Sequence, residues 1–85
     1  MAQHTVDVHR YGPHVAVFDV HLAGYREVFT VTTGQKSVVI TMLDESDAAH
    51  SEAQVFVFAK PYGWDLDVPD DEALLLVWQS VGVQR

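Results

Sequence analysis

Carboxylates are the chemically active side chains that this sequence concentrates most. Nine of its twelve acidic residues fall between Asp44 and Glu72, a stretch in which Lys60 is the one basic residue, and the formal charge of the chain is −7. Carboxylates can hold a cation, exchange protons or meet a basic protein surface, depending on their spacing and burial. Because the residues before Asp44 are nearly neutral, we expect the C-terminal half to meet a basic protein partner.

Two aromatic side chains, Tyr62 and Trp64, stand within this acidic half. Tyr and Trp anchor many protein interfaces, whereas a Trp in the loop of a small domain can also fold back into the core. Both alternatives stay open for Trp64, and an exposed Trp64 would mark a binding site. The candidate partner-binding residues are Tyr62, Trp64, Asp65, Asp67, Asp70 and Asp71.

Several of the acids also have ordinary structural reasons for their positions. Residues 70–72 would occupy the first turn of a helix, where the helix dipole favours negative charge. Asp44, Asp47 and Glu52 would lie around the start of another helix. The run from Asp65 to Glu72 lacks the Asp-x-Asp-x-Asp-Gly spacing of a calcium loop. The acids therefore serve either to bind a partner or only to keep the protein soluble, and the sequence leaves this choice open.

Histidine is the other residue type that could bind a metal. A first hairpin with Gly12 and Pro13 as its turn brings His4, Asp19 and His21 near one another. Two imidazoles and a carboxylate can bind zinc or iron, so these three residues are a weak metal candidate. No compact motif such as His-Glu-x-x-His accompanies them, and we expect no cofactor.

Catalytic motifs are missing from the sequence. It has no cysteine, no Gly-x-Ser-x-Gly, no P-loop and no Gly-x-Gly-x-x-Gly. A chain of 85 residues also rarely encloses a ligand-sized cavity on its own. We therefore expect a protein that is not an enzyme, with a small metal-dependent or dimeric enzyme using His4, Asp19 and His21 as the alternative.

Nucleic acids and membranes are poor candidates for partners. Phosphate recognition needs clustered Lys and Arg, and the five such residues here are scattered along the chain. The first residues show no basic region followed by an apolar run, and the longest apolar run, Ala73 to Trp78, is far too short to span a membrane. We expect a cytoplasmic protein, and its composition fits a bacterial or phage origin.

The elements that position these residues begin with a β-hairpin. Residues 5–11 alternate between polar and apolar side chains, and residues 14–22 are rich in strand formers. With Gly12 and Pro13 as a two-residue turn, the predicted pairs are Arg10–Val15, Val8–Val17 and Val6–Asp19. This register places four valines on one face, namely Val6, Val8, Val15 and Val17.

A second hairpin is predicted from residues 26–33 and 36–43. Gly34 and Gln35 would form its two-residue turn, in which Gly34 takes a positive φ. The predicted pairs are Val31–Val38, Phe29–Ile40 and Glu27–Met42. The expected core residues are Phe29, Val31, Val38, Ile40 and Met42.

A helix is predicted between Leu43 and Pro61, with Ser46 or Ser51 as its cap. Its apolar face would consist of Ala49, Ala53, Phe56 and Val57. The alternative is a fifth strand at residues 55–59, because β-branched and aromatic side chains favour strands.

The clearest helix signals lie at residues 70–80. Pro69 precedes this segment, acids fill its first turn, and Gly82 follows its last periodic residue. Its predicted apolar face consists of Leu74, Val77, Trp78 and Val81, widened by Leu75 and Leu76.

The predicted fold is a single α+β domain over residues 1–85. It has a four-stranded antiparallel sheet from two N-terminal hairpins and two C-terminal helices on one face, or a fifth strand in place of one helix. The uncovered face of the sheet is a candidate homodimer surface, because a small core often gains stability from a second subunit. The two candidate sets are Val28, Val39 and Leu43, or Ala16, Phe18 and Val20.

These observations favour a small acidic interaction protein, which would act as a regulator, an inhibitor or an accessory subunit. It would bind a basic protein surface through its acidic C-terminal half. In size and charge the chain is similar to small acidic proteins from phages and toxin–immunity loci. A structural subunit that assembles with copies of itself is the remaining alternative.

Overall fold

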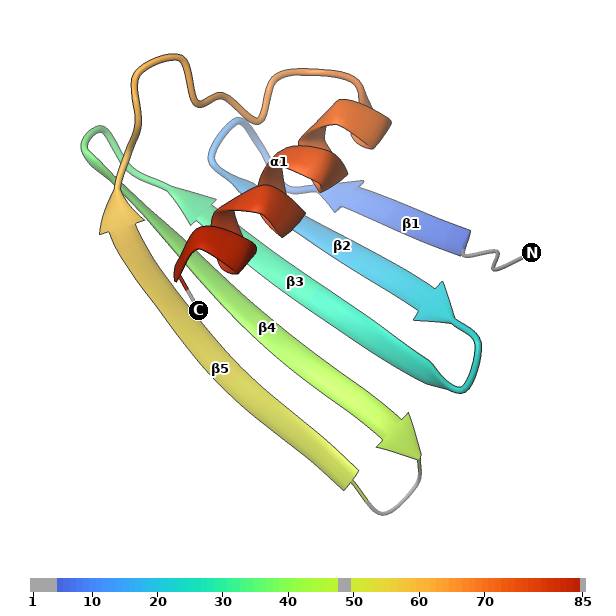
Figure 1. Ribbon diagram of the computed structural model, residues 1–85. Helices are drawn as coiled ribbons and strands as arrows, with labels where there is room; N and C mark the ends of the chain where they lie inside the picture. Colours follow the sequence, from blue (N-terminus) through green and yellow to red (C-terminus); the bar gives the residue numbers. More distant parts are fainter. Residues whose placement is uncertain (1–4, 48–49, 85) are drawn as a thin grey trace.

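The computed structural model describes residues 5–47 and 50–84. The chain has an α+β fold in which a five-stranded antiparallel sheet is followed by a C-terminal helix. The elements are β1 (Thr5–Arg10), β2 (Val15–Leu22), β3 (Tyr25–Thr33), β4 (Ser37–Asp47), β5 (His50–Ala59) and α1 (Asp70–Gln84). Each strand pairs with the next one along the chain, so the sheet is a meander, and α1 lies across one of its faces (Figure 1).

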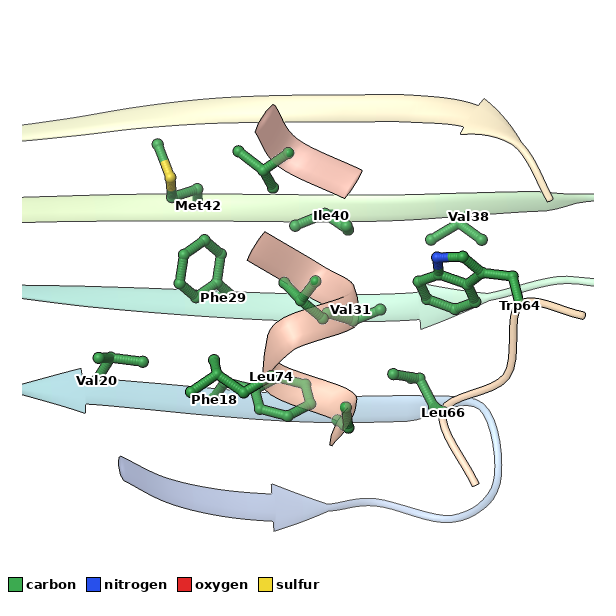
Figure 2. Close-up of a cluster of buried hydrophobic side chains, with 14 residues drawn as sticks. Phe18, Val20, Phe29, Val31, Val38, Ile40, Met42, Trp64, Leu66 and Leu74 are labelled. Atoms are coloured by element: carbon green, nitrogen blue, oxygen red, sulfur yellow. The ribbon is translucent and has the colours of Figure 1, made fainter. Parts of the chain in front are cut away.

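Alternation along the strands separates the two faces of the sheet, because successive side chains of a strand point to opposite sides. The face beneath α1 is apolar, and its side chains form one buried cluster with the helix and the preceding loop (Figure 2). The strand residues of the cluster are Ala16, Phe18, Val20, Phe29, Val31, Val38, Ile40 and Met42. All five predicted core residues are among them, so that prediction is confirmed.

The other face of the sheet, which we call the open face, carries no helix within the described residues (Figure 1). Its central part consists of Val15, Val17, Val28, Thr30, Thr32, Val39, Thr41, Leu43, Val55 and Val57. The candidate dimer set with Val28, Val39 and Leu43 therefore lies on the open face. The rival set, Ala16, Phe18 and Val20, is buried beneath α1.

The first hairpin differs from its prediction by one residue. Three loop residues, Gly12 to His14, separate Tyr11 from Val15, and the Tyr11 N–H donates to the Val15 carbonyl over 2.9 Å. Gly12 takes a φ of 78°, in the region that favours glycine. The observed pairs are Val6–Val20, Val8–Phe18 and Arg10–Ala16. A one-residue shift turns a strand over, so the prediction that placed Val15 and Val17 with the valines of β1 is wrong.

The second hairpin keeps its predicted faces but not its predicted pairs. The observed pairs include Val31–Ile40, Phe29–Met42 and Glu27–Asp44. They differ from the predicted pairs by two residues, which leaves every side chain on its expected face. The Gly34 N–H donates to the Ser37 carbonyl over 2.8 Å, and Gly34 is not among the glycines with positive φ. The predicted two-residue turn at Gly34 is therefore wrong.

The prediction of a helix between Leu43 and Pro61 is also wrong, and the alternative of a fifth strand is confirmed. β4 continues through the polar segment after Leu43, and β5 pairs with it in antiparallel fashion. Neither Ser46 nor Ser51 begins a helix, because both lie within strands. The sheet therefore has five strands instead of four, and one C-terminal helix follows it instead of two.

The side chains of β5 show why this segment forms a strand and not a helix. Phe56 and Phe58 pack against the buried cluster, whereas Val55 and Val57 are each 63% exposed. This alternation has a period of two residues, which suits a strand and not a helix. Ala49, which we assigned to the predicted helix face, lies outside the described residues.

Helix α1 confirms the prediction for residues 70–80 and extends beyond it to Gln84. Its first turn closes with a bond from the Ala73 N–H to the Pro69 carbonyl, 2.9 Å long. Gly82 lies inside the helix and does not end it. Ala73, Leu74, Val77 and Val81 are buried against the sheet. No helix within residues 5–47 and 50–84 is long and apolar enough to cross a membrane.

Candidate partner-binding site

The loop from Lys60 to Pro69 connects β5 to α1 and carries most of the predicted site. Trp64 folds inward from this loop and is 6% exposed. Its indole Nε1–H donates to Ser80 Oγ over 2.9 Å, and its ring meets Phe58 edge to face, with centroids 6.2 Å apart. Trp64 and Leu66 lie at the end of the buried cluster (Figure 2). Of the two alternatives for Trp64, the structure shows the one in which it completes the core.

Arg10, at the end of β1, ties the same loop to the sheet. Its guanidinium donates to the Leu66 carbonyl over 2.7 Å and to the Val68 carbonyl over 2.8 Å. It also forms an ion pair of 3.1 Å with Asp70, the first residue of α1. Charged donors make stronger hydrogen bonds than neutral ones. Trp64 and Arg10 therefore hold the two halves of the loop in place before any partner arrives.

The remaining predicted site residues point to solvent, and we call them the acidic edge: Tyr62, Asp65, Asp67, Asp70 and Asp71. Tyr62 is fully exposed, and all four aspartates are exposed as well. The Asp67 N–H donates to Asp65 Oδ1 over 2.9 Å, which stabilises the turn between them. The carboxylates of Asp67 and Asp71 make no hydrogen bond or ion pair with the described residues.

A pocket of about 400 Å³ lies beside the acidic edge. It is formed by the β1–β2 loop, the end of β3 and the loop before α1, and it is lined by Arg10, Gly12, Pro13, His14, Thr33, Lys60, Asp65, Leu66 and Asp67. The lining contains both carboxylates and cationic groups. Arg10 is already bonded to the loop, whereas the Lys60 ammonium has no partner among the described residues. The pocket is therefore suited to a polar or charged group.

The acids that precede this loop occupy a different place. Asp44 and Glu52 pair across β4 and β5, in a row that also includes Glu27 of β3. Glu45 lies on the open face. Because no helix begins near residue 46, the helix dipole does not explain the positions of Asp44, Asp47 and Glu52, and that part of the sequence interpretation is wrong.

The open face carries its own charged cluster at one end. Arg26 of β3 donates two hydrogen bonds to the Asp19 carboxylate, each 2.8 Å long, and approaches Glu45 at 3.4 Å. The hydrogen bond from Arg26 is the main cause that lowers the pKa of Asp19, with smaller contributions from the charges of Arg26, His21 and His9. Asp19 in turn raises the pKa of Arg26. The pair is therefore ionised on both sides at neutral pH.

The weak metal candidate is only partly described. His21 Nε2 lies 3.2 Å from Asp19 Oδ1, as the sequence interpretation expected of neighbours, but this carboxylate is already held by Arg26. His4 lies outside the described residues. Among residues 5–47 and 50–84 there is no group of three or more His, Cys, Asp or Glu side chains that could hold a metal ion.

Three residues near the site carry no clear signal in the sequence. Arg10 belongs to β1, more than fifty positions from the loop that it holds, so only the tertiary fold brings them together. His14 and Lys60 reach the pocket in the same way. The Asp19–Arg26 pair was more accessible to prediction, because Ala23 and Gly24 form a tight turn between β2 and β3 that places the two residues on adjacent strands.

Comparisons with protein-family models, with curated proteins and with solved structures find no match for this chain. The class that the structure defines is an α+β protein with a meander sheet and one C-terminal helix.

Proposed function

We propose that this protein is a non-enzymatic interaction protein, such as a regulator, an inhibitor or an accessory subunit, that binds a basic protein surface through its acidic edge. The observation that carries the proposal is the contrast within one loop. Trp64 is buried and holds the loop, while Tyr62 next to it is fully exposed among exposed aspartates. An exposed Tyr surrounded by charge is typical of an interface anchor.

Preorganisation of the loop supports this function. Binding is weakened when a partner must first order a flexible segment. Here Trp64 and Arg10 fix both halves of the loop in the folded protein. A partner therefore does not have to order the loop when it binds, and no binding free energy is lost in doing so. Asp67 and Asp71 have no partner within the described residues, so their oxygens are available to Lys or Arg side chains.

The overall charge supports the same direction of recognition. A chain with a charge of −7 attracts basic proteins from a distance and repels acidic ones. The pocket beside the acidic edge, which Asp65 and Asp67 help to line, provides space for a side chain of the partner. This geometry favours a protein with an exposed Lys or Arg near an apolar or aromatic patch.

The test begins with affinity capture of a partner from the native cell, followed by titration of the purified pair at increasing salt. The Asp67→Asn/Asp71→Asn variant should lose about tenfold in affinity, since exposed ion pairs contribute up to about 1 kcal/mol each. The matched control is Asp7→Asn/Glu52→Gln, which removes the same charge from exposed positions on β1 and β5. Equal losses in both variants, or an affinity that salt does not change, would contradict the proposal.

Replacement of Tyr62 tests the aromatic part of the acidic edge separately. Tyr62→Ala should weaken binding by at least about tenfold, because truncation of an interface anchor typically costs about 2 kcal/mol or more. The folded state should keep its stability, since the Tyr62 side chain is fully exposed. The control is Tyr11→Ala, which removes another exposed tyrosine, and it should leave the affinity unchanged.

A further inference from the structure

We infer that the open face of the sheet is the contact surface between two copies of this chain. The face is apolar in its centre, and no part of the described chain covers it (Figure 1). Val55 and Val57 are each 63% exposed there, on β5, which among the described strands is the edge strand beside β4. Soluble monomers rarely expose a continuous apolar patch of this kind.

The size of the open face matches what a dimer needs. Five strands about 4.8 Å apart, with about eight residues each at about 3.3 Å per residue, make a face of roughly 24 by 26 Å, or about 600 Å² on each copy, and this area includes the polar margins at β1 and at the Arg26 end. Two copies would then bury about 1,200 Å², which reaches the range of stable interfaces. An interface that covered only the valines of β5 would be too small for this.

The distribution of charge selects a second copy as the occupant. Two chains of charge −7 repel each other, so they can meet only where both are nearly neutral. The centre of the open face contains valine, threonine and leucine and no ionisable side chain. The ionisable side chains lie at its margins, with Asp7 and His9 on the edge strand β1 and Arg26 bonded to Asp19 and Glu45 at one end. The acidic edge belongs to the loop before α1 and to the first turn of α1, and it stays free in such a dimer.

The side chains of the open face also fit a contact with an identical face. In a two-fold dimer each patch must complement itself, and a surface of valine and threonine can do so without pairing opposite charges. Thr30 and Thr41 pair across β3 and β4 near the centre. Both are half-buried in the single chain. A second sheet that covers them must leave their hydroxyls hydrogen-bonded, and threonines that face each other across two strands can bond to one another.

Sedimentation equilibrium of the whole chain tests the inference, over a concentration range from about 1 μM to about 1 mM. The expected mass is twice 9.5 kDa at the upper end of the range. Val55→Lys and Thr41→Lys, both on the open face, should each raise the dissociation constant of the dimer by at least about a hundredfold. Each substitution occurs once in both copies, so it places two ammonium groups in one apolar interface. A wild type that stays monomeric throughout would overturn the inference.

The matched control is Leu75→Lys, which makes the same kind of change at a residue that is 53% exposed on α1. It should leave the dissociation constant within about twofold of the wild type, since an exposed site away from the interface contributes little. A dimer that survives Thr41→Lys, or one that Leu75→Lys disrupts as well, would place the contact elsewhere and overturn the inference. Circular dichroism confirms that each variant is folded. If Thr41→Lys does not fold, Val55→Lys decides the question.

Salt separates this inference from the proposed function. The dimer should persist or tighten as salt increases, because the centre of its interface is uncharged and screening weakens the repulsion between the two chains. Binding of a basic partner to the acidic edge should weaken under the same conditions. A dimer that dissociates at high salt would overturn the inference without affecting the proposed function, since the two surfaces share no residue.

Discussion

The two faces of the sheet are built from the same five strands, yet they differ in the size of their side chains. The face beneath α1 contains large residues such as Phe18, Phe29 and Met42, whereas the open face contains mainly valine and threonine. Large side chains gain most from burial, and they reach far enough from the sheet to interlock with a helix. In this sheet, the bulkier of the two alternating sets of side chains lies on the face that becomes the core.

The two faces of the sheet also differ in how far their polar contacts are shielded from water. Beneath α1, hydrogen bonds from polar side chains secure the edge of the core, as Trp64 does with Ser80 and Arg10 does with the loop. On the open face, the Asp19–Arg26 pair stays partly in contact with water. Polar contacts near the core should therefore matter more for stability than the ion pair on the open face, and this order can be measured.

The largest expected effect is in the core. Phe29→Ala should reduce the free energy of unfolding by about 3–5 kcal/mol, because it leaves a cavity among fully buried side chains. Its neighbour in sequence, Val28, points to the open face, and Val28→Ala should cost about 1 kcal/mol. Urea unfolding measured below the concentration of any self-association compares the two. Similar losses would show that both faces contribute equally to the core.

The second effect concerns the anchor of the loop. Ser80→Ala should reduce the free energy of unfolding by about 2 kcal/mol, because the indole N–H of Trp64 loses its acceptor in a buried position. Ser80 also donates to the Leu76 carbonyl over 2.7 Å, a bond that the helix can replace. The control, Ser37→Ala, changes an exposed serine and should have little effect. Unfolding followed by tryptophan fluorescence gives both values.

The third effect concerns the link between β1 and the loop. Arg10→Gln removes a guanidinium that donates to two loop carbonyls and to Asp70, and it should cost about 1–2 kcal/mol. Amide hydrogen exchange of residues 64–68 should increase more than the global loss of stability explains, since the loop is released locally. Arg10→Lys keeps the charge but not the planar fork, so it should restore only part of the protection. Complete protection with Lys would contradict this role of the guanidinium.

The sequence contains enough information for the sheet core but not for its registers. Phe29, Val31, Val38, Ile40 and Met42 were predictable, because alternation with a period of two residues defines the face of a strand whatever its exact partner is. The register of the first hairpin was not predictable from Gly12-Pro13, since a glycine and a proline are compatible with loops of two or three residues. One additional loop residue was enough to exchange the faces of β1.

The acids explain why residues 44–59 were harder to interpret. A polar segment between two apolar ones is typical of a loop before a helix, and the sequence there offers two plausible caps. In the structure, β4 carries Asp44 and Glu45 as strand residues, and the pairing with β5 outweighs local helix signals. For the site, the exposed acids of the loop followed from the sequence. The contacts of Arg10 and the burial of Trp64 required the tertiary structure.

The smallest expected effect is on the open face and depends on pH. Arg26 lowers the pKa of Asp19 in the folded state. A depressed pKa in the folded state stabilises the protein at pH values above the ordinary pKa of Asp, which is about 4. This stabilisation is lost as the pH falls through the pKa that Asp19 has in the folded state. Lowering the pH from about 5 to about 2 should therefore remove it from the wild type. Water screens the pair, since the Arg26 side chain is 42% exposed, so the change should be small.

Arg26→Gln tests this directly, because it removes the main cause of the lowered pKa. Urea unfolding at several pH values should show a flatter loss of stability with acid in the variant than in the wild type. Lys36→Gln removes one positive charge from an exposed loop position and should keep the slope of the wild type. Equal slopes in Arg26→Gln and the wild type would mean that the Asp19–Arg26 pair contributes no pH-dependent stability.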